Sequence, residues 1–307
     1  MSNIAFIYPG QGAQKAGMGK DFYENSPLSK QIFDDASKLL GMDMKALCFE
    51  PNDKLDITEY TQAAMVTTCL AMTAVVKERG IYPNVTAGLS LGEYCAIAET
   101  GAMSVMDAIK TVRRRGILMQ EAVPKGEGTM AAILGLDAET IEQVIEPISG
   151  VSVANYNCPG QIVITGKVAA VEEACEKLSE AGAKRTVRLN VSGPFHSKML
   201  ETAGCELAAE LSAVPLEKPM IPYVTNVTGE HVIDETEIKA LLAAQVASPV
   251  RWQQCVESML KAGVDTFIEI GPGKTLAGFM RKISKGTKVI NIEKWEDLEK
   301  LEELKAH

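Results

Sequence analysis

The 307-residue sequence has few of the features from which metal sites and membrane spans are built. It contains three histidines and neither an H-E-x-x-H nor a C-x-x-C pattern, so no metal site is expected. No apolar run approaches the roughly 18 residues that a membrane-spanning helix needs. The first apolar run, residues 4–8, is short and has no basic flank, so no secretory signal is expected.

The seven cysteines are odd in number and lie in apolar or mixed surroundings. This usage is typical of reduced thiols in a cytoplasmic protein and argues against a disulfide framework. The formal net charge of −9 argues against a general nucleic-acid binder. With 46% hydrophobic and 23% charged residues, the chain has the composition of a globular protein of one or two domains.

The first 126 residues alternate between strand and helix patterns. Residues 4–8 and 85–87 read as buried strands, and residues 91–99 begin a helix. Residues 61–79 predict a largely buried helix that ends before Gly80, a residue favoured just past helix ends. Strands alternating with helices indicate an α/β fold with a parallel sheet covered on both faces.

A glycine-containing hinge is expected at residues 124–128, and the strands and helices predicted after it follow one another in a different order. The predicted strands cover 130–134, 151–156, 161–165 and 184–189, and the predicted helices cover 138–145 and 168–180. The order β-α-β-β-α-β is that of a ferredoxin-like α+β domain. We therefore predict a small domain at residues 127–191, inserted into the larger one.

A second hinge at residues 192–194 returns the chain to the large domain, which would comprise residues 1–126 and 192–307. Strands are expected at 221–226, 266–270 and 288–292. Residues 294–305 read as a charged tail helix that mainly presents a solvated face.

The strongest chemical signal is Gly88-Leu89-Ser90-Leu91-Gly92, between a predicted strand and a predicted helix. G-x-S-x-G in this context is the nucleophile elbow, in which flanking glycines allow a strained turn that exposes the serine. The backbone N–H that follows the serine can then face a developing oxyanion. The motif predicts that Ser90 is a nucleophile.

A nucleophilic serine needs a base, and elimination favours one histidine. His307 ends the chain and is expected to fray, and His231 is expected to be exposed in a turn-like stretch. His196 follows Gly193-Pro194, where a rigid turn enters a helix. No acidic partner is evident, so a Ser90–His196 dyad whose base is oriented by a backbone carbonyl is the simpler hypothesis.

Three consecutive arginines, Arg113 to Arg115, follow the serine by about one helix length. One of them could pair with a substrate carboxylate through two hydrogen bonds. Sequence alone does not choose which, although a solvated face is favoured for Arg113 and Arg114.

Several motifs together resemble the malonyl-CoA:acyl carrier protein transacylases of bacterial type II fatty-acid synthesis and the acyltransferase domains of polyketide synthases. They run in order over nearly the whole chain: YPGQGAQ at 8–14, TQ at 61–62, GLSLGEY at 88–94, RG at 115–116, MQ at 119–120, NYNCPGQ at 155–161, GPFHS at 193–197, Q at 245, SPV at 248–250 and EIGPG at 269–273. The resemblance implies that the large domain is α/β-hydrolase-like and the small one ferredoxin-like.

The resemblance also implies roles for the catalytic residues. Ser90 would carry the acyl group and His196 would be its base. The backbone N–H groups of Gln11 and Leu91 would form the oxyanion hole, and the carbonyl of Gln245 would orient His196.

For the substrate, the resemblance implies that Arg115 holds the free malonyl carboxylate and that Asn157 and Phe195 lie at the pocket. Acetyl-CoA would leave a buried Arg115 without a carboxylate partner and should bind poorly. One departure is Leu89, where members of the family often have histidine. His196 is then the only base candidate.

The activity implied is malonyl transfer from malonyl-CoA to the phosphopantetheine thiol of acyl carrier protein, through a malonyl-serine intermediate and without a metal or redox cofactor. A monomer is expected. Because such carriers are acidic, docking would need a local basic patch. The candidates are Lys184, Arg185 and Arg188, or Lys274, Arg281 and Lys282. Two alternative functions remain open. A serine esterase would have a buried Asp or Glu against His196 and no arginine in the pocket. The other alternative is an inactive carrier-binding scaffold.

Overall fold

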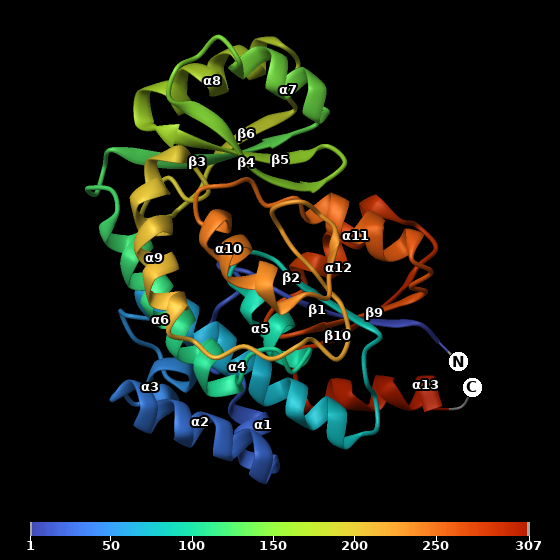
Figure 1. Ribbon diagram of the computed structural model, residues 1–307. Coiled ribbons are helices and arrows are strands. Elements are labelled where there is room, and N and C mark those ends of the chain that lie inside the picture. The colour runs from blue at the N-terminus through green and yellow to red at the C-terminus, as the bar shows by residue number, and fades with distance from the viewer. Residues whose placement is uncertain (1, 306–307) are drawn as a thin grey trace.

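The computed structural model describes residues 2–305 and consists of two parts, each built on its own sheet (Figure 1). The smaller part stands above the larger one in this view. His307 lies outside the described residues. Within those residues, every helix is too short or too polar to cross a membrane.

The larger part contains a six-stranded sheet in which all neighbouring pairs are parallel except the last. In spatial order its strands are β10 (Lys288–Ile292), β9 (Thr266–Ile270), β1 (Ile4–Tyr8), β2 (Val85–Gly88), β7 (Tyr223–Val224) and β8 (His231–Val232). Every residue of β1, β2 and β9 is buried, as expected for a parallel sheet covered on both faces. The strands predicted at 4–8, 266–270 and 288–292 are confirmed.

Helices cover this sheet on both faces (Figure 1). Up to the tail, the helices of the larger part are α1 (Lys20–Asn25), α2 (Pro27–Leu40), α3 (Met44–Phe49), α4 (Thr58–Glu78), α5 (Gly92–Glu99), α6 (Val105–Glu121), α9 (Glu201–Ser212), α10 (Glu235–Gln245), α11 (Trp252–Lys261) and α12 (Thr275–Ile283). A short 3₁₀ helix, Lys198–Leu200, precedes α9. Helix α4 is buried along most of its length, and Gly80 follows it with φ 78°, as its sequence predicts.

Two expectations for the C-terminal third are wrong. The strand expected at 221–226 is reduced to β7, because Pro222 has no N–H for the ladder and the chain turns back over residues 225–229. The tail is a 3₁₀ helix, Trp295–Leu301, followed by α13 (Glu302–Lys305). Leu298 and Leu301 are buried rather than solvated. Apolar residues three positions apart share one face of a 3₁₀ helix, which has three residues per turn.

The smaller part is an antiparallel four-stranded sheet in the order β4-β5-β3-β6, with two helices. Along the chain its elements are β3 (Gly128–Leu134), α7 (Ala138–Ile145), β4 (Val151–Cys158), β5 (Gln161–Lys167), α8 (Val168–Glu180) and β6 (Arg185–Arg188). The predicted β-α-β-β-α-β order is therefore observed. The helices pack on one face of the sheet.

The other face of the small sheet meets the larger part. Met130, Ala154 and Val163 belong to the core of the larger part. Backbone hydrogen bonds join β4 to the segment before α11: the Val250 N–H donates to the Ala154 carbonyl at 2.7 Å, and the Tyr156 N–H donates to the Val250 carbonyl at 2.9 Å. These contacts fix the small sheet over the carboxyl ends of β1 and β2.

Candidate active site

Ser90 lies in the sharp turn between β2 and α5, and its backbone is strained. Its φ is 55° and that of His196 is 58°, and these are the only non-glycine residues with positive φ among residues 2–305. A Cβ on Gly88 would lie 2.0 Å from the backbone of Gly92, and a Cβ on Gly92 would lie 2.5 Å from the Tyr8 carbonyl oxygen. Only glycine fits at these two positions, which explains the G-x-S-x-G spacing.

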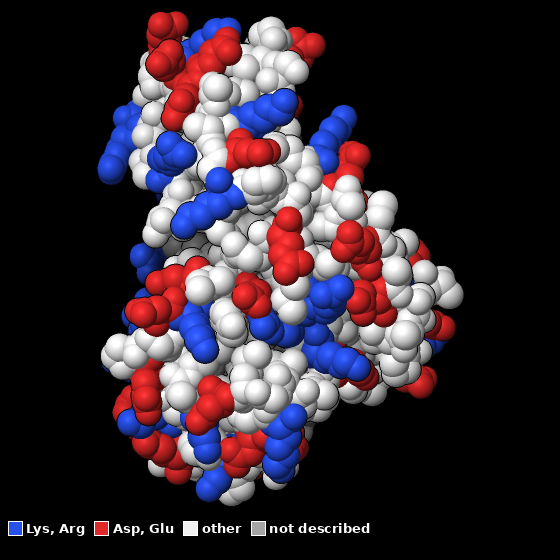
Figure 2. All heavy atoms as spheres, turned by 90° about the vertical axis from the view of Figure 1, so that its left-hand side faces the viewer, with Lys and Arg blue, Asp and Glu red and all other residues white. Residues whose placement is uncertain are grey.

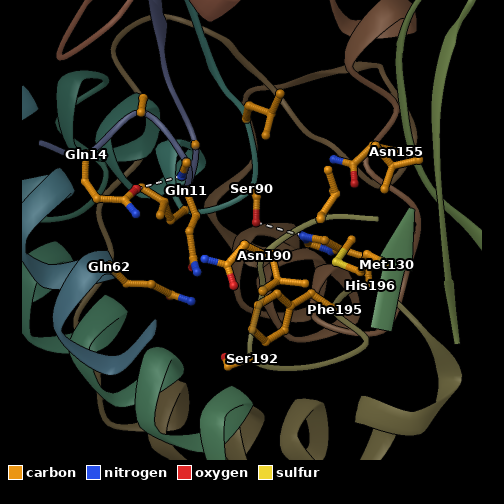
Figure 3. A pocket seen from close by; sticks show the side chains of 18 of the residues that line it. Gln11, Gln14, Gln62, Ser90, Met130, Asn155, Asn190, Ser192, Phe195 and His196 are labelled. Atoms are coloured by element: carbon orange, nitrogen blue, oxygen red, sulfur yellow. Dashed lines mark hydrogen bonds between the residues drawn. The ribbon is translucent and has the colours of Figure 1, made fainter. Parts of the chain in front are cut away.

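Ser90 and His196 are in direct contact. The Ser90 Oγ and the His196 Nε2 are 2.8 Å apart, as the dashed line in Figure 3 marks. His196 Nδ1 lies 2.9 Å from the Gln245 backbone oxygen, which can only accept, so the ring proton is on Nδ1 and Nε2 is the free acceptor. Burial, and secondly the charge of Arg115, lower the pKa of His196 to about 4. The imidazole is therefore neutral, as a general base must be, at neutral pH.

The three arginines differ in burial because they lie on different sides of α6. Arg115 is fully buried, and its guanidinium donates to Gln62 Oε1 at 2.7 Å, Gln245 Oε1 at 2.8 Å and Ser90 Oγ at 3.1 Å. Of the three arginines, Arg115 is therefore the one whose guanidinium lies beside Ser90. Amide and hydroxyl oxygens bind its two terminal nitrogens, whereas its Nε is buried without a hydrogen-bond partner.

Arg113 is not the solvated residue that was expected. It pairs with Glu59 at 2.6 Å and its guanidinium carbon lies 4.5 Å from the centre of the Tyr60 ring, so only 15% of its side chain is exposed. Arg114 is more exposed and pairs with Glu210 at 2.8 Å.

A cavity of about 830 Å³ opens beside Ser90 between the two parts of the molecule. Gln11, Leu91, Asn157 and Phe195 line it, as does Leu89. In Figure 3, Gln11, Gln14 and Gln62 lie on one side of Ser90, whereas Met130, Asn155 and His196 lie on the other. Asn157 Oδ1 is buried without a hydrogen-bond partner, so it is a free acceptor at the cavity.

His231 and the cysteines lie outside this cavity. His231 lies in β8 and is half-buried rather than exposed in a turn, because β8 pairs with β7. All seven cysteines are free thiols, and five of them are buried.

Sequence reasoning assigned no role to three further residues around the dyad. Gln62 holds Arg115, while Asn226 Oδ1 accepts from the Ser90 N–H at 2.7 Å. The Glu93 carboxylate accepts from Gln245 Nε2 at 2.6 Å. Gln62 and Glu93 lie within motifs of the resemblance, but Asn226 carried no local signal because its contacts are distant in sequence.

Comparisons with known proteins agree with this geometry. The family model described as an acyl transferase domain matches residues 5–295. The chain is 45% identical over 304 residues to a malonyl CoA-acyl carrier protein transacylase of Bacillus subtilis, covering 97% of this chain and 96% of that protein.

Solved structures give the same result. The crystal structure of a malonyl CoA-acyl carrier protein transacylase from Clostridium perfringens matches with a TM-score of 0.96 and 44% identity, covering 99% of this chain and 98% of the other. A structure of a type II PKS acyl-carrier protein in complex with its malonyl-transacylase matches with a TM-score of 0.96 and 37% identity, covering 99% of this chain and 100% of the other. The strained serine, its neutral histidine and these matches over nearly the full length together establish that the chain belongs to the acyl transferase domain family.

Proposed function

We propose that this protein transfers a malonyl group from malonyl-CoA to the phosphopantetheine thiol of acyl carrier protein, through a malonyl ester on Ser90. One observation carries the proposal. The Ser90 hydroxyl lies 2.8 Å from the imidazole of His196 and 3.1 Å from the guanidinium of Arg115. A nucleophile, its base and a cation that can bind a carboxylate therefore meet at one oxygen.

In the first half-reaction His196 Nε2 takes the Ser90 proton while Oγ attacks the thioester carbonyl of malonyl-CoA. The backbone N–H groups of Gln11 and Leu91 stabilise the oxyanion, and one such donor is typically worth about 3 kcal/mol. The intermediate collapses, the thiolate of coenzyme A leaves, and Nε2 returns the proton to it. The Gln245 carbonyl keeps the imidazole in the required tautomer throughout.

In the second half-reaction the carrier thiol enters the emptied site. His196 Nε2 takes its proton, and the thiolate attacks the ester carbonyl of malonyl-Ser90. The second tetrahedral intermediate uses the same oxyanion hole, and the departing Ser90 oxygen recovers the proton from His196. The enzyme returns to its starting state, and no step requires an oxidant or reductant.

Selectivity for malonyl rests on Arg115, whose guanidinium binds the free carboxylate of the acyl group. Phe195 supplies an apolar wall, and the free oxygen of Asn157 can accept a hydrogen bond from the substrate. An esterase is disfavoured because His196 Nδ1 meets a carbonyl rather than a carboxylate and because an arginine is buried at the nucleophile. An inactive scaffold is disfavoured because the dyad is complete.

We assign residues 1–126 and 192–307 to an α/β-hydrolase-like domain and residues 127–191 to a ferredoxin-like domain. The elbow after β2 supports the first assignment, and the strand order β4-β5-β3-β6 supports the second. Free, mostly buried thiols support a cytoplasmic location, and we expect a monomer.

For the carrier we favour the C-terminal of the two candidate basic patches. Lys274 and Arg281 line a second cavity of about 700 Å³ together with Lys285, Lys288 and Lys300. Helix α12 joins this surface to the active site, since Thr275 and Phe279 line the catalytic cavity. Lys282 instead donates to Gln161 at 3.3 Å. The alternative residues Lys184, Arg185 and Arg188 lie at β6, an edge strand of the small sheet.

Mass spectrometry after incubation with malonyl-CoA tests the proposed function. We expect a stable adduct of one malonyl group on the wild type and none on Ser90→Ala, and we expect the adduct to disappear when a carrier with a free phosphopantetheine thiol is added. Rapid hydrolysis without a carrier would instead indicate an esterase. Absence of any adduct would indicate a scaffold.

A further inference from the structure

A buried carboxyl group that the mechanism does not use lies one helical turn from the nucleophile. Glu93 is in the first turn of α5 and has no exposed surface. Its Oε2 accepts from Gln245 Nε2 at 2.6 Å and from the Asn226 N–H at 3.1 Å. Burial raises the pKa of Glu93 to about 7. Burying a carboxyl group costs free energy unless the group is well hydrogen-bonded. We therefore ask what the two contacts of Glu93 do.

The contact between Glu93 and the Asn226 N–H connects Glu93 to the turn that holds Ser90. Asn226 Oδ1 accepts from the Ser90 N–H, and its Nδ2 donates to the Gly88 carbonyl at 2.8 Å. The Asn226 side chain thus bridges the two sides of the strained turn. Through the Asn226 backbone, Glu93 helps to hold Ser90, which would affect every acyl substrate alike.

The contact between Glu93 and the Gln245 side chain reaches Arg115, because Gln245 also contacts that guanidinium. It would therefore affect only substrates that carry a free carboxylate. Gln245 Nε2 donates to Glu93 and, at 3.1 Å, to the Ser90 carbonyl, so Gln245 Oε1 faces the Arg115 guanidinium. A glutamine amide turned by 180° has nearly the same shape but would place N–H groups against N–H groups. The Glu93 carboxylate and the Ser90 carbonyl both only accept, so both favour the orientation in which the Gln245 oxygen faces Arg115, and Glu93 makes the shorter of the two contacts.

We propose that Glu93 is a positioning residue for acyl selectivity: it fixes the side-chain amide of Gln245, which in turn holds Arg115 where a substrate carboxylate can bind. The inference rests on the proposed function, since it assumes that Arg115 binds that carboxylate. The Gln245 backbone carbonyl, which holds His196, is untouched by substitutions of the Gln245 side chain. The selectivity role can therefore be separated from the base.

The test compares malonyl-CoA with acetyl-CoA as acyl donors at pH 8, above the pKa of Glu93. Glu93→Met removes the acceptor at similar volume, and we expect the ratio of malonyl to acetyl kcat/KM to fall on the order of tenfold or more. Glu93→Gln keeps one accepting oxygen, so it should retain a ratio within about threefold of the wild type. A purely structural role would lower both activities together and leave the ratio unchanged.

A double-mutant cycle then asks whether Glu93 acts through Gln245. Gln245→Met should lower the ratio as Glu93→Met does, and the double variant should match Gln245→Met within about twofold, because the two changes break one chain of contacts. Additive losses would overturn the proposal, as would an unchanged ratio in Glu93→Met. If Glu93→Met does not fold, an unchanged ratio in Gln245→Met overturns it and a lowered one supports it. A wild type without malonyl preference would instead overturn the proposed function, and this inference with it.

Discussion

Ser90 and His196 share a positive-φ backbone conformation that residues other than glycine seldom adopt, and their side chains are in direct contact beside the cavity. A strained backbone conformation of this kind destabilises the folded protein by of order 1–3 kcal/mol per residue, so surrounding contacts must hold each residue in it. The Asn226 amide and the Gln245 carbonyl supply those contacts, one for each residue. The dyad is therefore preorganised by residues far away in sequence.

Arg115→Ala should change selectivity more than general activity. The variant loses the charged donors that bind the malonyl carboxylate, so malonyl kcat/KM should fall on the order of 100-fold or more. For acetyl transfer the variant loses the hydrogen bonds from Arg115 to Ser90, Gln62 and Gln245 but no bond to the acyl group, so this activity should fall by about tenfold at most. Steady-state kinetics with both donors measure the two losses.

Arg113→Ala is the matched control, because Arg113 lies on the same helix but pairs with Glu59. Its malonyl to acetyl ratio should equal that of the wild type. Equal losses of malonyl and acetyl transfer in Arg115→Ala would contradict the role given to Arg115.

The reactivity of Ser90 should persist to low pH. His196 has its pKa lowered to about 4, so the neutral base is present above that pH and is lost only below it. Phenylmethanesulfonyl fluoride, an uncharged serine reagent, should inactivate the wild type with a half-maximal rate near pH 4. In Arg115→Ala the midpoint should move upward, because the charge of Arg115 is the second cause of the shift. A midpoint at the ordinary pKa of histidine in both proteins would rule this out.

The residues of the dyad could be predicted locally, but their supports could not. Ser90 stands in a short motif and His196 is the histidine left by elimination. The choice of Arg115 needed the structure, because residues at successive positions of a helix face different sides and only the packing decides which side is buried. Asn226 and Gly88 are 138 residues apart, so no local pattern joins them.

At the scale of elements, the strands buried on both faces were predicted best. Short segments rich in β-branched and aromatic residues indicate such strands, as in β1 (IAFIY) and β9 (TFIEI). The tail was predicted less well, because the spacing of Trp295, Leu298 and Leu301 fits a 3₁₀ helix as well as one side of an α-helix. Strand β7 was overestimated because a turn and a proline limit it to two residues.

Two glycine substitutions should have opposite effects on stability. In Gly88→Ala the new Cβ would lie 2.0 Å from backbone atoms of Gly92, which cannot move independently of the elbow. Urea unfolding should show a loss of about 3 kcal/mol or more, and Ser90 should lose its reactivity.

Gly278→Ala is the control within α12, where the added methyl group meets no atom within 4 Å. Replacing a helical glycine with alanine should raise the free energy of unfolding by about 1 kcal/mol and leave activity unchanged. Similar stability for the two variants would argue against the close packing of the elbow.

At the scale of the whole molecule, both parts line the cavity at Ser90. The larger part supplies Ser90 and His196, whereas Met130, Asn155 and Asn157 reach the cavity from the small sheet. The order of the elements in the smaller part was predictable from the sequence. The packing between the parts was not, because it depends on bridges such as that between Asn155 and Val250. Figure 2 shows acidic and basic side chains interspersed over one face that includes both parts.

Docking of the acidic carrier should depend on the surface at α12. Reversing two charges there, in Arg281→Glu/Lys285→Glu, should raise KM for the carrier by roughly tenfold at low salt and leave KM for malonyl-CoA within about twofold. Added salt should shrink the difference between this variant and the wild type, because exposed charges are screened over about 10 Å at 0.1 M ionic strength. Initial rates at varied carrier and salt concentrations measure both effects.

The same reversal at the alternative patch, Lys184→Glu/Arg185→Glu, is the control and should leave KM for the carrier near the wild-type value. If this control raised KM and the α12 variant did not, the carrier would dock on the small sheet at β6. If salt changed KM in neither variant nor the wild type, opposite charges would not guide the carrier, and apolar contacts would have to supply the affinity.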